Sequence, residues 1–299
     1  MAGPGRFPKT ESNSTLRSGI NSHPCRPCIV CYHSFRPQHQ FPVTKQPIPE
    51  DLPAWRKSLR AELIAARLAV PRETREVAYA AMGSHLDAVK DAIQGLVIGL
   101  CSPFRGEPDL RELVLSWVDA GATAAMPALV EKNTPMRFRR WSRDTPMTRG
   151  VWNIPIPDGT EVLVPDVLFI PMVAYDWQGY RLGYGGGYFD RMLADISPLP
   201  ITVGVALAQS RIDTIYPQPY DIPMDCVLTE AGLHMPVSGE LASLTMDAAA
   251  CRLRELAVSR RLPRVQEAAL EPPRVELSSP VCYAAEFPGY FGETTEKKP

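Results

Sequence analysis

The sequence lacks a long apolar run, an excess of charge of one sign and a fibrous or disulfide-rich composition. Its longest nearly apolar window is Leu96 to Cys101, far shorter than the roughly 20 residues that cross a bilayer, so no membrane-spanning segment is predicted. Lys and Arg total 32 against 33 Asp and Glu, for a net charge of -1, which argues against a protein that coats nucleic acid through a strong overall field. Apolar residues make up 45% of the chain, enough for a buried core, and global disorder is excluded.

Cysteines are few and unevenly spaced, at 7 of 299 residues. An oxidising compartment favours an even number in a regular framework, so we expect reduced thiols and a cytoplasmic location. Cys25, Cys28 and Cys31 form a C-x-x-C-x-x-C run, a spacing that soft-metal and iron–sulfur sites use. The run is surrounded by Pro, Ser and Arg and no second C-x-x-C follows it, which favours a disordered extension over a metal site.

Composition divides the chain into three parts. Residues 1–48 are basic and Pro-rich; they have few acids, as a transit peptide does, but lack its amphipathic spacing, so a disordered extension is predicted. Residues 49–236 are predicted to form one domain. Residues 237–299 are predicted to be a C-terminal extension, with one possible helix over 240–262 followed by a Pro-rich disordered tail.

Helical and strand patterns alternate through the central part. Helical spacing of apolar residues covers 51–69, 72–91 and 107–120. Runs that predict strands cover 96–101, 122–130, 136–141, 167–173, 201–207 and 226–229. Most of these strands are too apolar to have a face in water, as expected for parallel strands with helices on both sides. The sequence therefore predicts an α/β fold, a single three-layer domain with a mostly parallel central sheet flanked by helices.

A glycine-rich segment, RLGYGGGYFDRML over residues 181–193, carries the strongest functional signal. Glycines let the backbone approach a ligand closely, and a helix N-terminus offers N–H groups and a positive dipole end to an anion. The segment is not a dinucleotide fingerprint, since Tyr188 stands where the last glycine belongs, and it lacks the Gly-Lys-Ser/Thr triplet of a P-loop. Asp190, a carboxylate just inside this cradle, favours a phosphate carried with Mg²⁺ over bare phosphate.

Five segments together resemble the 5-formyltetrahydrofolate cyclo-ligase family, also called 5,10-methenyltetrahydrofolate synthetases. The longest is the signature region over 166–190; the others are RKSLR at 56–60, SPFRGEPDLREL at 102–113, residues 136–141 with WNIPIP at 152–157, and DIPMDCVL at 221–228. Each residue alone has a structural interpretation, such as a solvated helix face for 56–60 or a first-turn acid for Asp190. Their occurrence in the family's order, over about residues 51–232, favours the functional interpretation.

The resemblance implies an ATP- and Mg²⁺-dependent ligase that converts 5-formyltetrahydrofolate to 5,10-methenyltetrahydrofolate. Phosphoryl transfer to the formyl oxygen would activate the substrate, and N10 would then close the ring as phosphate leaves. Such a reaction needs positioning and charge neutralisation rather than a protein nucleophile, which agrees with the absence of histidine from residues 100–230. The implied partners are ATP and a reduced formyl-folate, with no nucleic acid and no membrane, and we expect a monomer.

The family's functional positions map onto this sequence as ATP, substrate and metal sites. The implied ATP-binding residues are Arg56, Lys57, Arg60, Arg181, Leu182, Gly183, Tyr184, Gly185, Gly186, Gly187, Tyr188 and Phe189. The implied substrate-binding residues are Glu107, Trp152 and Tyr188, and the implied metal ligands are Asp190 and Asp225. No catalytic nucleophile or base is implied.

Departures from the family pattern leave a second interpretation open. Arg56 stands where the family usually has Lys, with Lys57 beside it, and Tyr184 and Gly186 stand where other members place basic residues. Less side-chain charge is then available to phosphate, so backbone N–H groups must supply more of the binding. The alternative is a non-catalytic folate- or nucleotide-binding paralogue; a third, weaker hypothesis is an RNA-associated protein that binds through the basic residues of 1–45.

Overall fold

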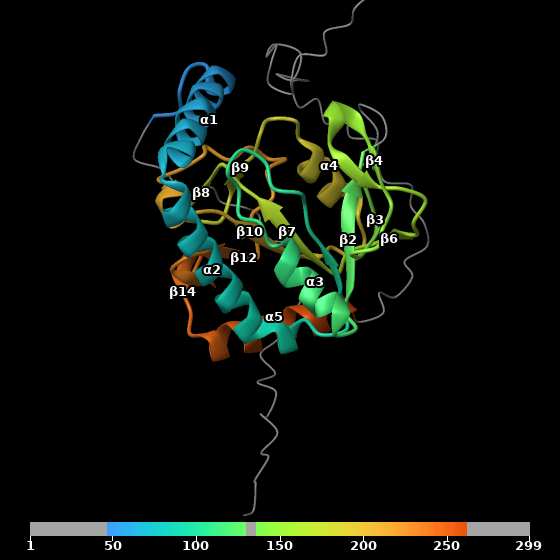
Figure 1. Cartoon of the computed structure of the whole chain (residues 1–299). Helices are drawn as coiled ribbons and strands as arrows, with labels where there is room; N and C mark the ends of the chain where they lie inside the picture. Colours follow the sequence, from blue (N-terminus) through green and yellow to red (C-terminus); the bar gives the residue numbers. More distant parts are fainter. Residues whose placement is uncertain (1–46, 130–135, 262–299) are drawn as a thin grey trace, which may run out of the picture. The chain divides into compact units, whose positions relative to one another are not determined.

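A nine-stranded mixed sheet forms the centre of the fold (Figure 1). The computed structural model describes residues 47–129 and 136–261; the C-x-x-C-x-x-C run, the predicted extension before residue 47 and the predicted tail after residue 261 lie outside these ranges. The strand order is β14-β13-β12-β10-β7-β1-β2-β3-β6. In chain order the strands are β1 (Val97–Gly99), β2 (Thr123–Ala128), β3 (Arg137–Trp141), β6 (Val162–Leu163), β7 (Val167–Pro171), β10 (Ile201–Val205), β12 (Cys226–Thr229), β13 (Gly232–Val237) and β14 (Glu240–Ser243).

Parallel strands occupy the middle of this sheet and antiparallel strands its two edges. β12, β10, β7, β1 and β2 pair in parallel, whereas β13 and β14 extend one edge and β3 and β6 the other in antiparallel fashion. In β7, Val167 and Phe169 face one core cluster, and Leu168 and Ile170 face another. All four are buried, as expected for a strand covered on both faces. The predicted α/β fold with a mostly parallel central sheet is confirmed.

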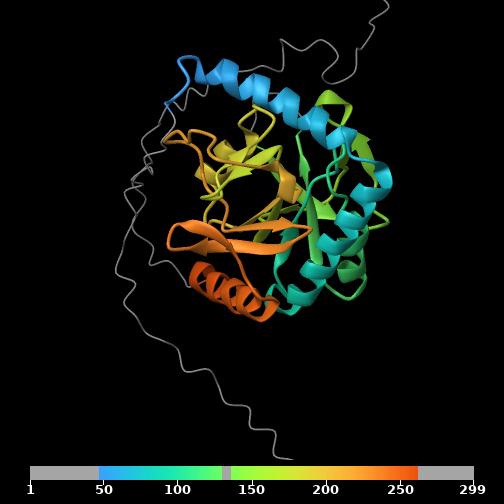
Figure 2. The ribbon, with the colours of Figure 1, turned by 90° about the vertical axis from the view of Figure 1, so that its left-hand side faces the viewer.

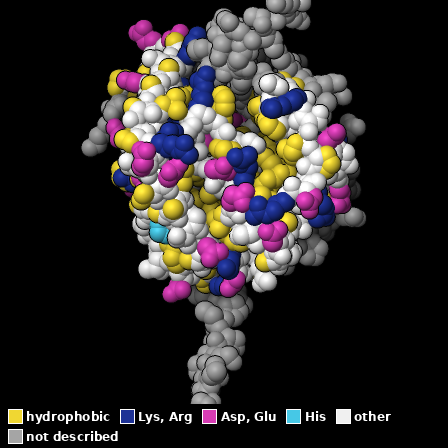
Figure 3. Space-filling view, viewed as in Figure 1, with side chains coloured by type: hydrophobic (Ala, Val, Ile, Leu, Met, Phe, Trp, Pro, Cys, Tyr) yellow, Lys and Arg dark blue, Asp and Glu magenta, His cyan; other side chains and the backbone are white. Residues whose placement is uncertain are grey.

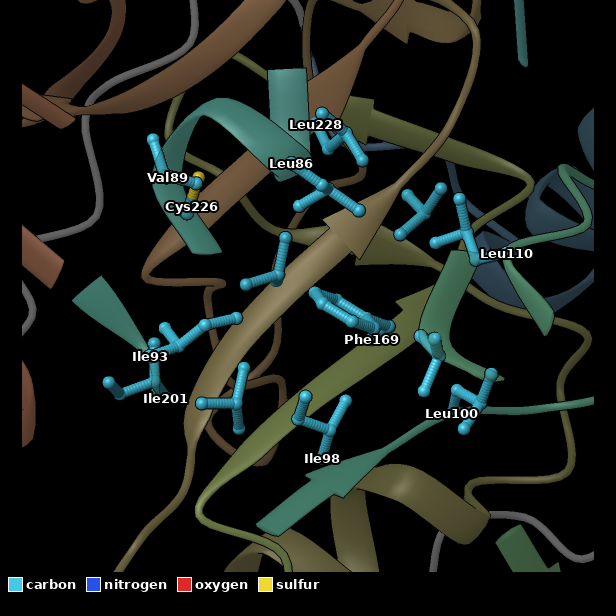
Figure 4. Close-up of a cluster of buried hydrophobic side chains, with 14 of the residues drawn as sticks. Leu86, Val89, Ile93, Ile98, Leu100, Leu110, Phe169, Ile201, Cys226 and Leu228 are labelled. Atoms are coloured by element: carbon cyan, nitrogen blue, oxygen red, sulfur yellow. The ribbon is translucent and has the colours of Figure 1, made fainter. Parts of the chain in front are cut away.

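Helices cover both faces of the sheet. α2 (Arg72–Val89), α3 (Arg111–Asp119) and α5 (Met246–Arg261) share one apolar cluster with the sheet, centred on Phe169 (Figure 4). α4 (Tyr188–Asp195) packs on the opposite face, where Met192 and Leu193 are buried in the cluster that contains Leu168. Figure 2 shows α5 below the hairpin of β13 and β14. The sequence predicts one helix over 240–262; the structure instead has β14 followed by α5, because residues 240–243 pair with β13.

The helix α1 (Leu52–Ala69) lies over a small three-stranded sheet with the order β11-β8-β9. Asp51 starts the helix by accepting a hydrogen bond from the Ala54 N–H at 2.9 Å, an N-cap contact. Leu59 and Leu63 pack against a buried cluster that includes Leu182. These contacts fix α1 beside the segment that follows β9. The small sheet consists of β8 (Ala174–Asp176), β9 (Arg181–Leu182) and β11 (Arg211–Ile212), and a separate pair consists of β4 (Met147–Arg149) and β5 (Pro155–Pro157).

The surface of the described residues carries charges of both signs. On the face shown in Figure 3, basic and acidic side chains are interspersed, and apolar side chains line a hollow near its middle. Among helices in the described ranges, none combines the length and the apolar character that a bilayer crossing requires.

Candidate functional site

The predicted site residues gather mainly at the carboxyl edge of the parallel strands, where the strand order reverses. From β1 the chain adds β2 on one side, and from β7 it adds β10 and β12 on the other. A crevice at such a reversal is where open α/β sheets bind ligands. A pocket of about 20 Å³ lies there, and its walls include Cys101, Glu107, Phe169 and Pro171. That volume admits about one water molecule, so the pocket in this structure is too small for a larger ligand.

The glycine-rich loop, residues 183–187, connects β9 to the N-terminus of α4. Gly185 and Gly187 have φ values of 92° and 62°, a region that favours glycine. Gly187 is the N-cap residue of α4, and no side chain caps the helix there. The N-cap residue therefore supplies no side-chain oxygen to the first turn of α4, where the Asp190 carboxylate accepts a hydrogen bond from its own N–H; a glycine at this position leaves room for an anion at the helix N-terminus.

Arg60 of α1, which the sequence predicts to bind phosphate, contacts the glycine-rich loop. Its Nε donates a hydrogen bond to the Gly183 carbonyl at 2.7 Å. A Cβ placed on Gly185 would lie 3.3 Å from the Arg60 Cζ, so the guanidinium rests directly on the loop backbone. Lys57 lies one turn earlier on α1 and is half-buried. The structure thus brings the α1 cation Arg60 to the loop.

Arg181 and Asp190 join the two ends of the loop. The Arg181 Nη2 donates to Asp190 Oδ1 at 2.5 Å, and its side chain is 4% exposed against 28% for Asp190. A second donation from Arg181 reaches the Ile222 carbonyl at 3.2 Å. Burial raises the pKa of Asp190; Arg181 opposes this effect, and the nearby carboxylate of Asp221 adds to it. Arg181 is therefore already paired with protein groups. Its side chain is buried beside the glycine-rich loop and does not face solvent.

Arg56 is also engaged with protein groups. It donates from Nη2 to Asp221 Oδ2 at 2.7 Å and from Nε to the Ile215 carbonyl at 3.1 Å. Both charged side chains are nearly buried, at 11% and 10% exposed. Asp176 holds the same segment in place, because its Oδ2 accepts the Ile215 N–H at 3.2 Å. Sequence reasoning missed Asp221 and Asp176, although both lie inside the segments that carry the resemblance.

Asp190 and Asp221 are two carboxylates in the same neighbourhood, and each is paired with an arginine, Asp190 with Arg181 and Asp221 with Arg56. The Asp221 carboxylate raises the pKa of Asp190, because a nearby negative charge disfavours ionisation, and a nearby cation would oppose that effect. Mg²⁺ commonly takes one or two carboxylates and completes its shell with water and phosphate oxygens. Within the described ranges, no cluster of three or more His, Cys, Asp or Glu side chains could hold a metal alone.

Asp225 does not join Asp190, contrary to the predicted pair of metal ligands. Its Oδ2 accepts hydrogen bonds from the Thr202 N–H at 2.7 Å and the Thr202 hydroxyl at 2.9 Å, and Arg260 of α5 completes its contacts. Asp225 precedes β12 and Thr202 begins β10, so both lie at the amino edge of the parallel strands. The glycine-rich loop lies at the carboxyl edge. In this structure the Asp225 carboxylate is therefore engaged with Thr202 and Arg260 at the amino edge, and its role as a metal ligand stays a prediction.

Glu107 and Tyr184 form a buried pair beside the pocket. The Tyr184 hydroxyl donates to Glu107 Oε1 at 2.5 Å, and the Phe104 N–H donates to Glu107 Oε2 at 2.9 Å. Burial raises the pKa of both groups, and the Tyr184 hydrogen bond partly offsets the effect on Glu107. Arg67, which sequence reasoning missed, donates to the Tyr184 hydroxyl at 2.7 Å. The Tyr184 hydroxyl therefore faces Glu107 in the wall of this pocket.

The other residues that the sequence predicts for the site lie in different environments, some in the core and some near the loop. Leu182 is buried under α1 and packs there. Tyr188 opens α4, its ring lies beside Gly186, and the Arg191 guanidinium covers the ring at 5.0 Å. Phe189 packs against the cluster on the α4 face of the sheet. The backbone at Trp152 lies in a short 3-10 helix, Val151–Asn153, and its side chain lies outside the described part of the structure.

Comparison with known proteins agrees with this arrangement. A model of the 5-formyltetrahydrofolate cyclo-ligase family matches residues 53–230, a range that contains the loop, Glu107 and all the paired arginines on α1 and β9. The 5-formyltetrahydrofolate cyclo-ligase of Haemophilus influenzae is 27% identical over 182 residues, which cover 58% of this chain and 96% of that protein. The corresponding protein of Mycolicibacterium smegmatis is 27% identical over 188 residues, which cover 59% of this chain and 94% of that protein.

A solved structure resembles the fold as well as the sequence. The NMR structure of Aquifex aeolicus 5,10-methenyltetrahydrofolate synthetase superimposes with a TM-score of 0.55 at 26% identity. The match covers 64% of this chain and 96% of that one. The similar region therefore takes in nearly the whole of each relative.

Proposed function

The chain belongs to the 5-formyltetrahydrofolate cyclo-ligase family, a family of ligases, and from that membership we propose that it closes 5-formyltetrahydrofolate to 5,10-methenyltetrahydrofolate with ATP and Mg²⁺. ATP supplies the phosphoryl group that activates the formyl oxygen. N10 then attacks the formyl carbon, phosphate leaves with that oxygen, and ADP is the other product. The single observation that supports this site for the reaction is the uncapped N-terminus of α4, reached by a glycine-rich loop on which Arg60 rests.

The glycine-rich loop and the first turn of α4 bind the triphosphate in this proposal. Backbone N–H groups supply most of the hydrogen bonds, because Tyr184 and Gly186 replace charged side chains in the loop. Arg60 adds positive charge and keeps the loop in the conformation that its positive-φ glycines allow. Preorganised donors of this kind stabilise charge in the transition state without reorganising during the reaction.

Asp190 and Asp221 hold the metal in this proposal, and each carboxylate also forms an ion pair with an arginine. Arg181 fixes the Asp190 carboxylate and Arg56 fixes that of Asp221. Mg²⁺ neutralises charge on the phosphoryl oxygens when it is bound. The arginines keep the two acids oriented toward the loop, so their role is to position the metal ligands rather than to contact the folate.

Glu107 faces the folate in this proposal. The proposed reaction requires small-molecule partners and no macromolecule. A carboxylate at the wall of a narrow apolar pocket accepts hydrogen bonds from the N–H groups of a pterin, and its burial strengthens that contact. We further propose that the protein works as a monomer in the cytoplasm. Size-exclusion chromatography of the purified chain tests the first of these two points.

The proposal is tested by mixing the purified full chain with 5-formyltetrahydrofolate and Mg·ATP. The methenyl product absorbs in the near ultraviolet where the substrate does not, so its appearance reports ring closure directly. Product that forms only when ATP, Mg²⁺ and folate are all present supports the proposal. Saturable binding of folate or ATP without product would instead favour the non-catalytic paralogue.

A further inference from the structure

We propose that Tyr184 is a positioning residue whose hydroxyl holds Glu107 in the orientation that meets the folate and ties the glycine-rich loop to the wall of the substrate pocket. This inference rests on the proposed function, because it takes Glu107 as a folate contact. It goes further by giving a loop residue of the nucleotide site a role in substrate binding.

The hydrogen bonds around Tyr184 are constrained by Arg67, and the phenolic proton has two acceptors within reach, Glu107 Oε1 at 2.5 Å and the Phe104 carbonyl at 3.5 Å. Arg67 Nη2, at 2.7 Å, is a donor without acceptor capacity, so the Tyr184 oxygen must accept from it. The single phenolic proton is then available for Glu107 Oε1 at 2.5 Å. The ring of Tyr184 is also held edge-on by Phe104, with centroids 5.6 Å apart. The much shorter contact favours donation of the Tyr184 proton to Glu107 over donation to the Phe104 carbonyl.

Both oxygens of Glu107 are fixed by these contacts. Oε1 accepts from Tyr184 and Oε2 accepts from the Phe104 N–H. Glu107 is 5% exposed and lines the pocket between the ends of β1 and β7. Because the backbone contact comes from a residue three positions away, Tyr184 is the partner that links the carboxylate to a different element of the fold.

Arg67 anchors this pair to the rigid part of the domain. Its Nη1 donates to the Met172 carbonyl just after β7, and its Nε donates to the Arg105 carbonyl, both at 3.1 Å. The side chain is 4% exposed and so joins α1, the end of β7 and the segment before Glu107. A displacement of Tyr184 is therefore passed on to Glu107 rather than taken up by the arginine.

The same hydroxyl links the two ligand sites. Tyr184 lies between Gly183 and Gly185, so a loop that adjusts to a triphosphate moves the tyrosine and with it the carboxylate in the pocket. The Tyr184 hydrogen bond lowers the pKa of Glu107, against the larger effect of burial. Loss of the hydroxyl therefore loosens Glu107 and favours its protonated form, which accepts pterin N–H groups less well.

The test compares the full-length wild type with Tyr184→Phe in steady-state kinetics. We expect the KM for 5-formyltetrahydrofolate to rise about tenfold, the effect of losing one hydrogen bond to a charged group. The acid limb of kcat/KM for the folate shifts to higher pH. The dependence of the folate KM on ATP concentration is lost or strongly reduced. Glu107→Gln removes the titrating group, and Tyr184→Phe added to it causes little further loss, because the two residues act as one unit.

Tyr79→Phe is the matched control. The Tyr79 hydroxyl donates to the carbonyl of Gly106. This change therefore also removes a partly buried hydrogen bond from the segment that carries Glu107, but it leaves the hydrogen bonds of the Glu107 carboxylate intact. We expect a lower Tm and an unshifted acid limb. Tyr184→Phe with wild-type folate KM and pH profile overturns the inference, and so does an equal pH shift in Tyr79→Phe. A wild-type chain that forms no methenyl product overturns the proposed function itself, before any variant is compared.

Discussion

Arg260, near the end of α5, binds Asp225 through two contacts, Nη2 to Oδ1 at 2.6 Å and Nη1 to Oδ2 at 2.9 Å. Asp225 lies inside the region that matches the cyclo-ligase family, and Arg260 lies after the end of that region at residue 230. The ion pair therefore connects α5 to the amino edge of the sheet. It gives Asp225 a structural role at a position where the family resemblance implies a metal ligand.

Asp225→Asn is predicted to reduce stability and to leave the Mg²⁺ requirement unchanged. The amide keeps one acceptor for Thr202, but it loses the charge opposite Arg260 and places an N–H₂ group among donors. We expect about 1–3 kcal/mol off the free energy of unfolding, measured by denaturant titration. A variant of normal stability whose activity needs much more Mg²⁺ would show that Asp225 binds the metal after all.

Asp190→Asn is predicted to reduce kcat by about 100-fold or more, because it removes the charge of the proposed metal ligand and leaves the buried Arg181 without its charged partner. A rise in the Mg²⁺ concentration needed for half-maximal rate, measured by titration, identifies the loss as one of metal binding. Asp195→Asn is the control, since Asp195 is an exposed acid on the same helix. Near-normal rates in Asp190→Asn would refute its ligand role.

Gly185→Ala is predicted to raise the KM for ATP more than that for the folate. Its φ of 92° is strained for alanine, and the new Cβ would lie 3.3 Å from the Arg60 Cζ, so both the loop and the arginine must shift. Gly159→Ala is the matched control, because Gly159 also has a positive φ, of 64°, and its Cβ would meet nothing within 4 Å. Both changes cost about 1–2 kcal/mol of stability, but only Gly185→Ala should affect ATP. Equal ATP kinetics in the two variants would contradict the loop's role.

The contribution of Asp176 to stability is predicted to fall as the pH rises from about 4 to about 6. Burial is the main cause that raises the pKa of this carboxyl to about 6, against the hydrogen bonds it accepts from the Ile215, Gln178 and Tyr180 N–H groups. The folded protein therefore keeps a proton that the unfolded chain has released, and its stability is greatest below the unfolded pKa. Asp176→Asn removes this group, so the difference in Tm between variant and wild type should change across that range. A constant difference from pH 4 to 7 would contradict the assignment.

Sequence patterns predicted the fold well because, in most strands and helices of this chain, the local sequence preference agrees with the secondary structure that forms. Val167 to Pro171 reads as a fully buried strand, and the structure places it at the centre of the sheet. The strands β8, β9 and β11 were missed because each has only two or three residues. That is too short for an alternation of apolar and polar side chains to be recognised. Residues 240–243 read as part of a helix because Glu, Leu and Ala favour helices, and pairing with β13 overrides that preference.

Only part of the candidate site could be predicted, because several of its residues are far apart in the sequence. The glycine-rich loop and Asp190 are adjacent in sequence, so their pattern indicates an anion site by itself. Arg67, Glu107 and Tyr184 are separated by up to 117 positions, and no spacing rule connects them. Asp225 was misplaced for a different reason: it precedes a parallel strand, and that position alone assigns it to the amino edge, away from the loop.

The most direct test of the account follows the formyl oxygen. Full-length protein is given 5-formyltetrahydrofolate that carries a heavy-oxygen label in the formyl group, together with Mg·ATP, and the released phosphate is analysed by mass spectrometry. Activation by phosphoryl transfer predicts that the label appears in the phosphate, one oxygen for each methenyl group formed. Methenyl product accompanied by unlabelled phosphate would contradict the proposed reaction at this site.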